Sequence, residues 1–71
     1  MNFKQSEKEI ETLKKFYTNE INQAIAKTGG PEKLALALNY NKTYLYNVFV
    51  KRRSVMALRR MVKKIYDEGI L

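Results

Sequence analysis

The 71-residue sequence contains no cysteine, no histidine and no tryptophan. Without cysteine no disulfide can stabilise the fold, and without cysteine or histidine the common zinc sites and the thiolate and imidazole catalysts are excluded. Carboxylates and lysines remain, but a domain this small encloses little volume in which their pKa values could be perturbed. We therefore expect neither an enzyme nor a protein with a metal or a cofactor.

Long apolar runs are also missing. The chain begins with the polar stretch MNFKQSEKE, and no apolar run approaches the roughly 20 residues that a membrane span requires. The length allows one domain with one core, over residues 1–71. These absences favour a soluble, cytoplasmic protein without a membrane partner.

Acidic residues are scarce in the second half of the chain. The formal net charge is +7, yet residues 1–31 are nearly balanced, with five Lys and four Glu. Residues 33–66 contain nine basic residues and no acidic one. A segment whose charged residues are all basic is suited to binding a polyanion, most simply a nucleic acid backbone. The nine basic residues are Lys33, Lys42, Lys51, Arg52, Arg53, Arg59, Arg60, Lys63 and Lys64.

Apolar residues at helical spacing predict a first helix over about residues 6–28. Ser6 and Glu9 form a capping box at its start, and residues 1–5 before it are expected to fray. Thr18 is followed by asparagine, and both are weak helix formers with capping ability. A break at that point would divide the first helix into two.

Further helices are expected after Gly29-Gly30-Pro31, because glycine follows helix ends and proline occupies first helical positions. One starts at this proline, and the next runs from Asn41 or Lys42 to about Val50. The latter contains β-branched and aromatic residues that also favour a strand, but its tight spacing to its neighbours favours a helix. Ser54 caps a last helix. The sequence thus predicts an all-α bundle of four to five helices.

Residues 31–50 follow the pattern of a helix-turn-helix unit. The apolar residues of each helix recur three and four positions apart and so share one face. Between the helices, Asn39 suits the left-handed conformation at a helix end, and Asn41 suits the cap of the next helix. The second helix of such a unit lies in the DNA major groove. The apolar residues are Leu34, Ala35, Leu38, Leu45, Val48 and Phe49.

Taken in this order, the residues resemble the helix-turn-helix of the phage repressor and Cro class of transcription regulators. That family has an alanine where the two helices cross, here Ala35, and branched apolar residues in its recognition helix, here Leu45 and Val48. Asn39 replaces the family's glycine at the turn, and Tyr40 replaces a smaller aliphatic residue. The resemblance implies a lambda-repressor-like fold and a DNA-binding regulator in a bacterial cell or a phage-infected host.

The resemblance also implies which side chains meet DNA. Lysine can donate to guanine, asparagine can pair with adenine and a threonine methyl can touch that of thymine, while other side chains hold phosphates. The implied base contacts are Lys42, Thr43, Tyr46 and Asn47. The implied phosphate contacts are Asn41, Tyr44, Lys51, Arg52, Arg53 and Lys33, with backbone N–H groups near Gly30 and Glu32.

We therefore expect sequence-specific binding of double-stranded DNA. The family commonly dimerises on symmetric sites, so a homodimer is a further expectation, with contacts around Phe16 and Tyr17 or in the tail Ile70-Leu71. The alternative is a basic interaction module, for example a phage-encoded inhibitor, that binds an acidic protein partner. Binding to RNA, or to DNA without sequence preference, is a third possibility.

Some of these residues also have purely structural explanations. Tyr40 is expected to join the core, whereas Tyr46 fits a core, a partner or a DNA contact equally well. The basic residues between Arg59 and Lys64 on the last helix are expected to form a solvated face, with long-range attraction to DNA as an added effect.

Overall fold

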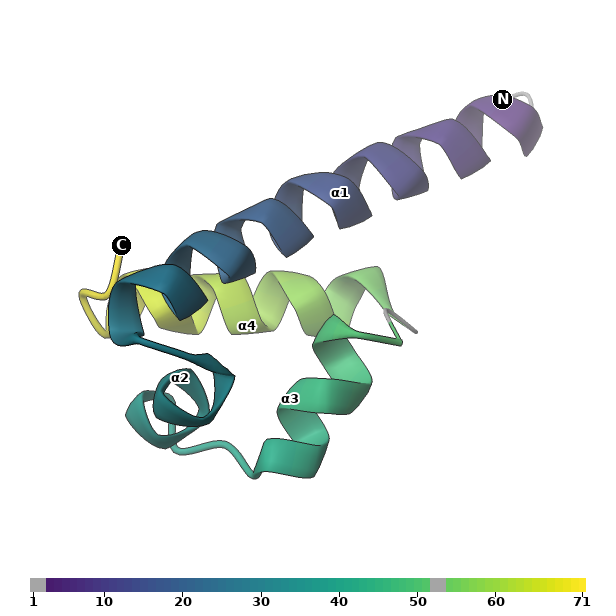
Figure 1. Cartoon of the computed structure of the whole chain (residues 1–71). Coiled ribbons are helices and arrows are strands. Elements are labelled where there is room, and N and C mark those ends of the chain that lie inside the picture. The colour runs from purple at the N-terminus through teal and green to yellow at the C-terminus, as the bar shows by residue number, and fades with distance from the viewer. Residues whose placement is uncertain (1–2, 52–53) are drawn as a thin grey trace.

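The computed structural model describes the backbone of residues 3–51 and 54–71, and the side chains of residues 8–51 and 54–71. Within these ranges the chain forms helices and no strand, which confirms the all-α expectation. The helices are α1 (Phe3–Thr28), α2 (Pro31–Ala37), α3 (Lys42–Phe49) and α4 (Val55–Asp67). In Figure 1, α1 and α4 lie along one side of the molecule, and α2 and α3 lie below them.

The first helix is continuous, so the break considered at Thr18 does not occur. It begins at Phe3, so Ser6 lies inside the helix and the prediction of a helix start at Ser6 was wrong. Residues 3–5, which were expected to fray, are helical. Residues 1–2 lie outside the described part of the chain. Its buried side chains among the described residues, Ile21 and Ala24, lie in its second half, and its first half extends away from the other helices (Figure 1).

Gly29-Gly30-Pro31 separates α1 from α2 as the sequence predicts. Gly29 has φ of +98°, a conformation that residues with a Cβ rarely adopt. The N–H groups of Gly29 and Gly30 both donate to the carbonyl of Ile25, at 3.0 and 2.9 Å. Pro31 occupies the first turn of α2, where no N–H donor is needed. The chain therefore turns sharply and places α2 next to the end of α1.

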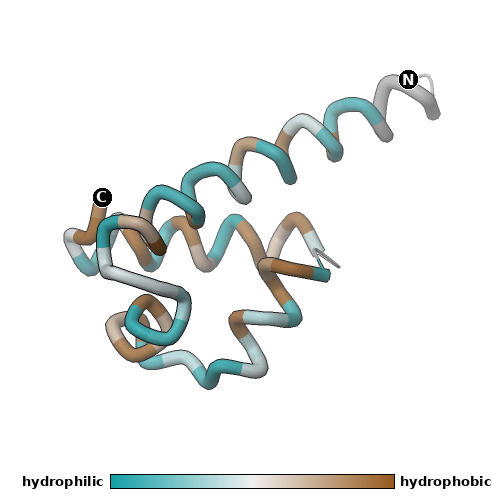
Figure 2. Tube along the Cα trace, in the orientation of Figure 1, coloured by the Kyte–Doolittle hydropathy of each residue, from teal (hydrophilic) through white to brown (hydrophobic). Residues whose placement is uncertain are grey.

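The core collects apolar side chains from all four helices. Ile21 and Ala24 come from the second half of α1, and α4 contributes a complete apolar stripe. The predicted cap of α4 is confirmed, because the Ser54 hydroxyl accepts a hydrogen bond from the N–H of Ala57 at 3.3 Å. Figure 2 shows hydrophobic positions gathered where the helices face one another. The buried residues are Ile21, Ala24, Leu34, Ala35, Leu38, Leu45, Val48, Leu58, Met61, Val62 and Ile65.

The C-terminal tail folds back on its own chain. After α4, Gly69 adopts φ of +73°, and the N–H of Ile70 donates to the carbonyl of Ile65 at 3.0 Å. Ile70 and Leu71 are half-buried against the core. The tail is therefore engaged within its own chain, unlike the first half of α1.

Candidate nucleic-acid interface

The connection between α2 and α3 is a tight turn built around Asn39. Its φ of +57° makes it the one described non-glycine residue in the left-handed region. Its N–H donates to the carbonyl of Leu36 at 3.1 Å, and the N–H of Tyr40 donates to that of Ala35 at 2.8 Å. These two bonds satisfy carbonyls that a helix end leaves free, in the pattern of a Schellman motif. Asn39 therefore stops α2 as the sequence predicts.

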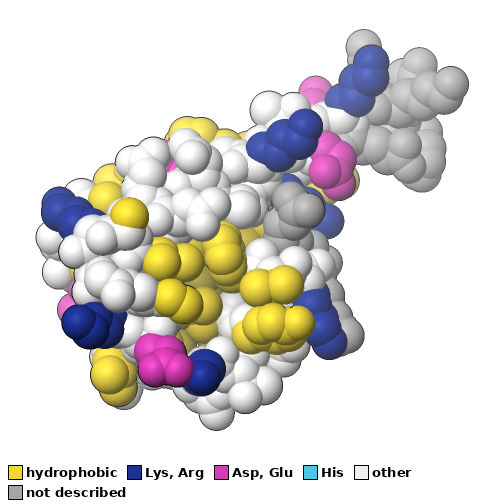
Figure 3. All heavy atoms as spheres, viewed as in Figure 1, with side chains coloured by type: hydrophobic (Ala, Val, Ile, Leu, Met, Phe, Trp, Pro, Cys, Tyr) yellow, Lys and Arg dark blue, Asp and Glu magenta, His cyan; other side chains and the backbone are white. Residues whose placement is uncertain are grey.

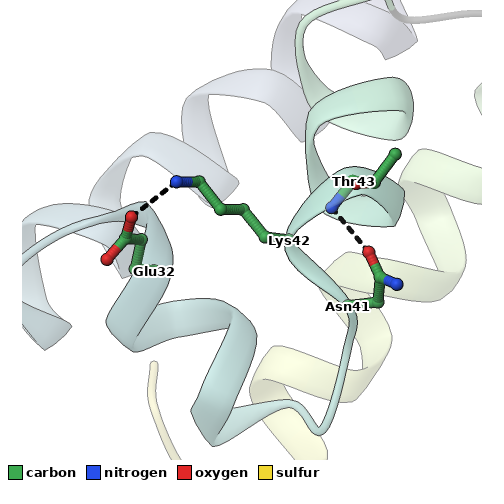
Figure 4. Close-up of polar contacts among 4 residues, drawn as sticks. All are labelled: Glu32, Asn41, Lys42 and Thr43. Atoms are coloured by element: carbon green, nitrogen blue, oxygen red, sulfur yellow. Dashed lines mark hydrogen bonds and ion pairs between the residues drawn. The ribbon is translucent and has the colours of Figure 1, made fainter.

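Asn41 then starts α3. Its side-chain oxygen accepts hydrogen bonds from the N–H groups of Thr43, at 2.6 Å, and Tyr44, at 3.3 Å (Figure 4). An N-cap of this kind stabilises a helix by about 1 kcal/mol. The predicted phosphate contact of Asn41 would come from its NH₂ group, because phosphate oxygens need a donor and the amide oxygen only accepts.

The two sides of α3 differ sharply. Leu45 and Val48 face the core and are buried. The four residues predicted to contact bases lie together over the first two turns of the helix. Lys42, Thr43 and Tyr46 are exposed, and Asn47 is half-buried. The structure thus brings these four side chains to one helix, on positions that the core does not occupy.

Lys42 is not free, because its Nζ lies 2.6 Å from Oε1 of Glu32 at the start of α2 (Figure 4). The hydrogen bond and the charge of Lys42 lower the pKa of Glu32, and the same contacts raise the pKa of Lys42. Both side chains are exposed, so the pair contributes little to stability. It does orient Lys42 across the gap between α2 and α3. Any contact of Lys42 with an anion must compete with Glu32.

An aromatic cluster joins the α2–α3 turn to α4. The rings of Tyr40 and Tyr44 lie 4.9 Å apart between centroids, and the Nζ of Lys64 lies 4.6 Å from the Tyr40 ring centroid. Burial, and to a smaller extent Tyr44, raises the pKa of Tyr40. Tyr40 packs against the core, as expected. Lys64 is half-buried in this cation–π contact, whereas Arg59, Arg60 and Lys63 form the exposed face that the sequence predicts.

The predicted phosphate contacts are dispersed around α3. Tyr44 and Lys51 are exposed, near the start and just after the end of this helix. Lys33 is exposed on α2. Its side chain lies along Gly29, at the junction of α1 and α2, because a Cβ added to Gly29 would lie 3.3 Å from the Cδ of Lys33. Arg52 and Arg53 lie outside the described residues. The N–H of Gly30 is bonded to Ile25 and is unavailable to a phosphate.

An apolar hollow of about 330 Å³ lies beside α3, and residues near the end of α1 and at the start of α2 also line it. Figure 3 shows the hydrophobic side chains gathered in the middle of this face, with an acidic and a basic side chain at its edge. Tyr46 and Val50 border the hollow and are 51% and 52% exposed. Sequence periodicity did not reveal it, because the lining residues come from three helices. They are Asn22, Ile25, Pro31, Glu32, Lys42, Leu45, Tyr46, Phe49 and Val50.

Comparisons with protein-family models, curated proteins and solved structures found no match to this chain. Among the described residues, no group of three or more acidic, histidine or cysteine side chains is arranged to hold a metal ion. In the same part of the chain, none of the helices combines the length and the apolar character needed to cross a membrane.

Proposed function

We propose that the protein binds double-stranded DNA sequence-specifically as a small transcription regulator, and that α2 and α3 form a helix-turn-helix with α3 as the recognition helix. The observation that carries this proposal is the two-sided character of α3. Leu45 and Val48 fix the helix on the core, while Lys42 and Thr43 are exposed at its start. The first turns of a recognition helix are the part that meets base edges in the major groove.

Two further features support the proposal. The turn at Asn39 and the cap at Asn41 give α3 a defined direction relative to α2, so its exposed side chains are held in register. The nine basic residues between positions 33 and 66, unaccompanied by acids, supply attraction to phosphates. If about five phosphates are neutralised, the logarithm of the affinity should fall with the logarithm of the salt concentration with a slope of about −4 to −5.

The test is enrichment of bound duplexes from a random pool, followed by affinity measurements on the enriched sequence and a scrambled one. We expect the enriched duplex to bind at least about 100-fold more tightly, since specific sites exceed non-specific ones by several orders of magnitude. Equal affinity for both duplexes would contradict sequence reading.

Matched threonine variants locate the reading face. Thr43→Ala should reduce the preference for the enriched duplex by about 1 to 2 kcal/mol, because a lost base contact has that value. Thr12→Ala makes the same change at an exposed site in the first half of α1 and should leave the preference unchanged. Asn47→Ala should lower the preference while attraction to scrambled DNA persists. Equal effects of the two threonine variants would contradict the assignment of α3.

The second candidate function is binding of an acidic protein partner, and the apolar hollow favours it. Exposed Tyr46 and Val50 beside half-buried Phe49 could receive an apolar side chain, which a phosphate backbone does not supply. Titration with an acidic amphipathic peptide should then shift the methyl resonances of Ile25 and Val50. If no duplex binds at low salt and these methyls shift, the second function replaces the first.

A further inference from the structure

Three large apolar side chains in the part of α1 farthest from the core, among the described residues, are exposed to solvent. Ile10, Leu13 and Phe16 are 42%, 43% and 55% exposed, although Ile21 and Ala24, nearer the end of the same helix, are fully buried. A 26-residue helix is about 39 Å long, which matches the longest dimension of the molecule, 40 Å. In Figure 2 this half of the helix extends away from the hydrophobic centre of the molecule.

The spacing of these residues is that of a helix pair. Ile10, Leu13 and Tyr17 are three and four residues apart, the spacing of the a and d positions of a heptad. Among parallel coiled coils, a β-branched residue at a with leucine at d favours an assembly of two helices. Tyr17 is half-buried and its ring lies 5.6 Å from that of Phe16, edge to face. The apolar stripe thus leads from solvent directly into the core.

The charges beside the stripe indicate which partner fits. With Ile10 at position a, Glu9 falls at position g and Lys14 at position e, on opposite sides of the stripe. In a parallel two-stranded pair, position g of one helix faces position e of the next heptad of the other. Glu9 of each copy would therefore face Lys14 of the other. Two copies of this chain are complementary in charge as well as in apolar pattern.

We propose that two copies of this chain associate through the first halves of their α1 helices, in parallel, with Ile10 and Leu13 at the centre and two Glu9–Lys14 ion pairs at the sides. The paired segment ends near Tyr17, where each α1 returns to its own core. Such an interface belongs to the small, transient class, and we expect a dissociation constant of about 0.1 mM. This association involves no DNA contact, so it is tested without DNA and independently of the proposed DNA binding.

The test is sedimentation equilibrium of the full chain, without DNA, from about 10 µM to 1 mM, which brackets the expected constant. We expect the average mass to rise from that of the 8.4 kDa monomer towards twice that value. A monomer at every concentration would overturn the proposal. Leu13→Gln should abolish association, whereas Leu36→Gln, at an exposed leucine on α2, should not. Equal effects of these two variants would overturn the assigned surface.

Charge exchange tests the parallel arrangement. Glu9→Lys and Lys14→Glu should each weaken self-association by about tenfold, because each replaces two attractive pairs by two repulsive ones. An equimolar mixture of the two variants should associate as well as the original chain, since each mixed pair restores two opposite-charge contacts. Failure of the mixture to recover would overturn the parallel arrangement.

A matched control separates charge pairing from net charge and helix content. Lys15→Glu makes the same change one residue further on, about 100° around the helix and away from the stripe. It should leave association unchanged, and circular dichroism should show equal helix content in all variants. If Lys15→Glu weakens association as much as Lys14→Glu, the specific Glu9–Lys14 pair is contradicted.

Discussion

The two halves of α1 have similar sequence patterns but different surroundings. Ile21 in the second half is fully buried in the core, whereas Ile10 in the first half is 42% exposed. Helical periodicity marks both residues as members of one apolar stripe. Periodicity therefore predicts a helix and its apolar face, but not what covers that face. In this chain the covered half supports the candidate DNA-reading unit, and the uncovered half is the proposed contact between copies.

The largest expected difference comes from one substitution made in both halves. Ile21→Ala should cost about 3 kcal/mol of the free energy of unfolding, because it leaves a cavity in the core. Ile10→Ala should cost less than about 0.5 kcal/mol, because its side chain is already largely hydrated. Urea denaturation at low micromolar protein concentration, where self-association is negligible, measures both. Similar losses would contradict the division of α1 into two halves.

Asparagine allows a second matched comparison, between the α2–α3 turn and the middle of α1. Asn39→Gly should raise the free energy of unfolding by up to about 1 kcal/mol, because glycine adopts φ of +57° without the penalty of a Cβ. Asn19→Gly should lower it by about 0.5 kcal/mol, since glycine is the poorer helix former. Thermal denaturation measures the sign in each case. A loss of stability in Asn39→Gly would contradict the role given to the left-handed residue.

Removal of the Glu32 carboxylate should strengthen binding to DNA. Glu32→Gln releases Lys42 and removes a negative charge beside α3, so we expect about threefold tighter binding to any duplex at low salt. Glu11→Gln removes the same charge from the first half of α1 and should have a clearly smaller effect. Fluorescence anisotropy measures both affinities. Equal gains would show that only the net charge matters.

The same ion pair has a defined pH dependence in the free protein. Because the pKa of Glu32 is lowered from its ordinary value of 4.5, the pair is fully formed above that value. It is lost as the pH falls through the lowered pKa. Carboxyl NMR titration should show a pKa of Glu32 below 4.5, and Lys42→Ala should return that pKa towards 4.5. An unchanged Glu32 titration in that variant would contradict the ion pair.

The smallest expected effect is a change in the pKa of Tyr66, which contacts Glu20 of α1. The Tyr66 hydroxyl of α4 donates to Oε2 of Glu20 at 2.6 Å, and this bond raises the pKa of Tyr66 above 10.0. The contact is present below the ordinary tyrosine pKa and is lost as the pH rises through the raised one. Glu20→Gln should therefore lower the pKa of Tyr66 in an NMR titration, whereas Glu9→Gln should not. No change in Glu20→Gln would contradict the contact.

The sequence predicted the helices well wherever single residues have strong local preferences. Gly29 and Pro31, Asn39 and Ser54 each ended or started a helix as expected, because their backbone or capping requirements act within a few residues. The start of α1 was predicted three residues too late, at Ser6. The first turn of α1 contains no acidic residue, so the sequence there lacks this usual mark of a helix start.

The candidate site was predictable only in part. The four residues implied as base contacts do share α3, since helix spacing determines that. The pairing of Lys42 with Glu32 and of Tyr66 with Glu20 joins exposed side chains 10 and 46 residues apart, for which no periodic pattern exists. The position of Lys64 over the Tyr40 ring depends likewise on how α4 crosses the α2–α3 turn. Contacts of this kind follow from tertiary packing.

The proposal that α3 reads DNA can be tested by amide NMR during titration with a random-sequence duplex at low salt. If α3 reads DNA, we expect salt-sensitive shifts concentrated from Asn41 to Asn47 and at Lys51, with residues 8–16 of α1 unaffected by direct contact. Shifts that are absent, or confined to Arg59 through Lys64 on α4, would contradict it.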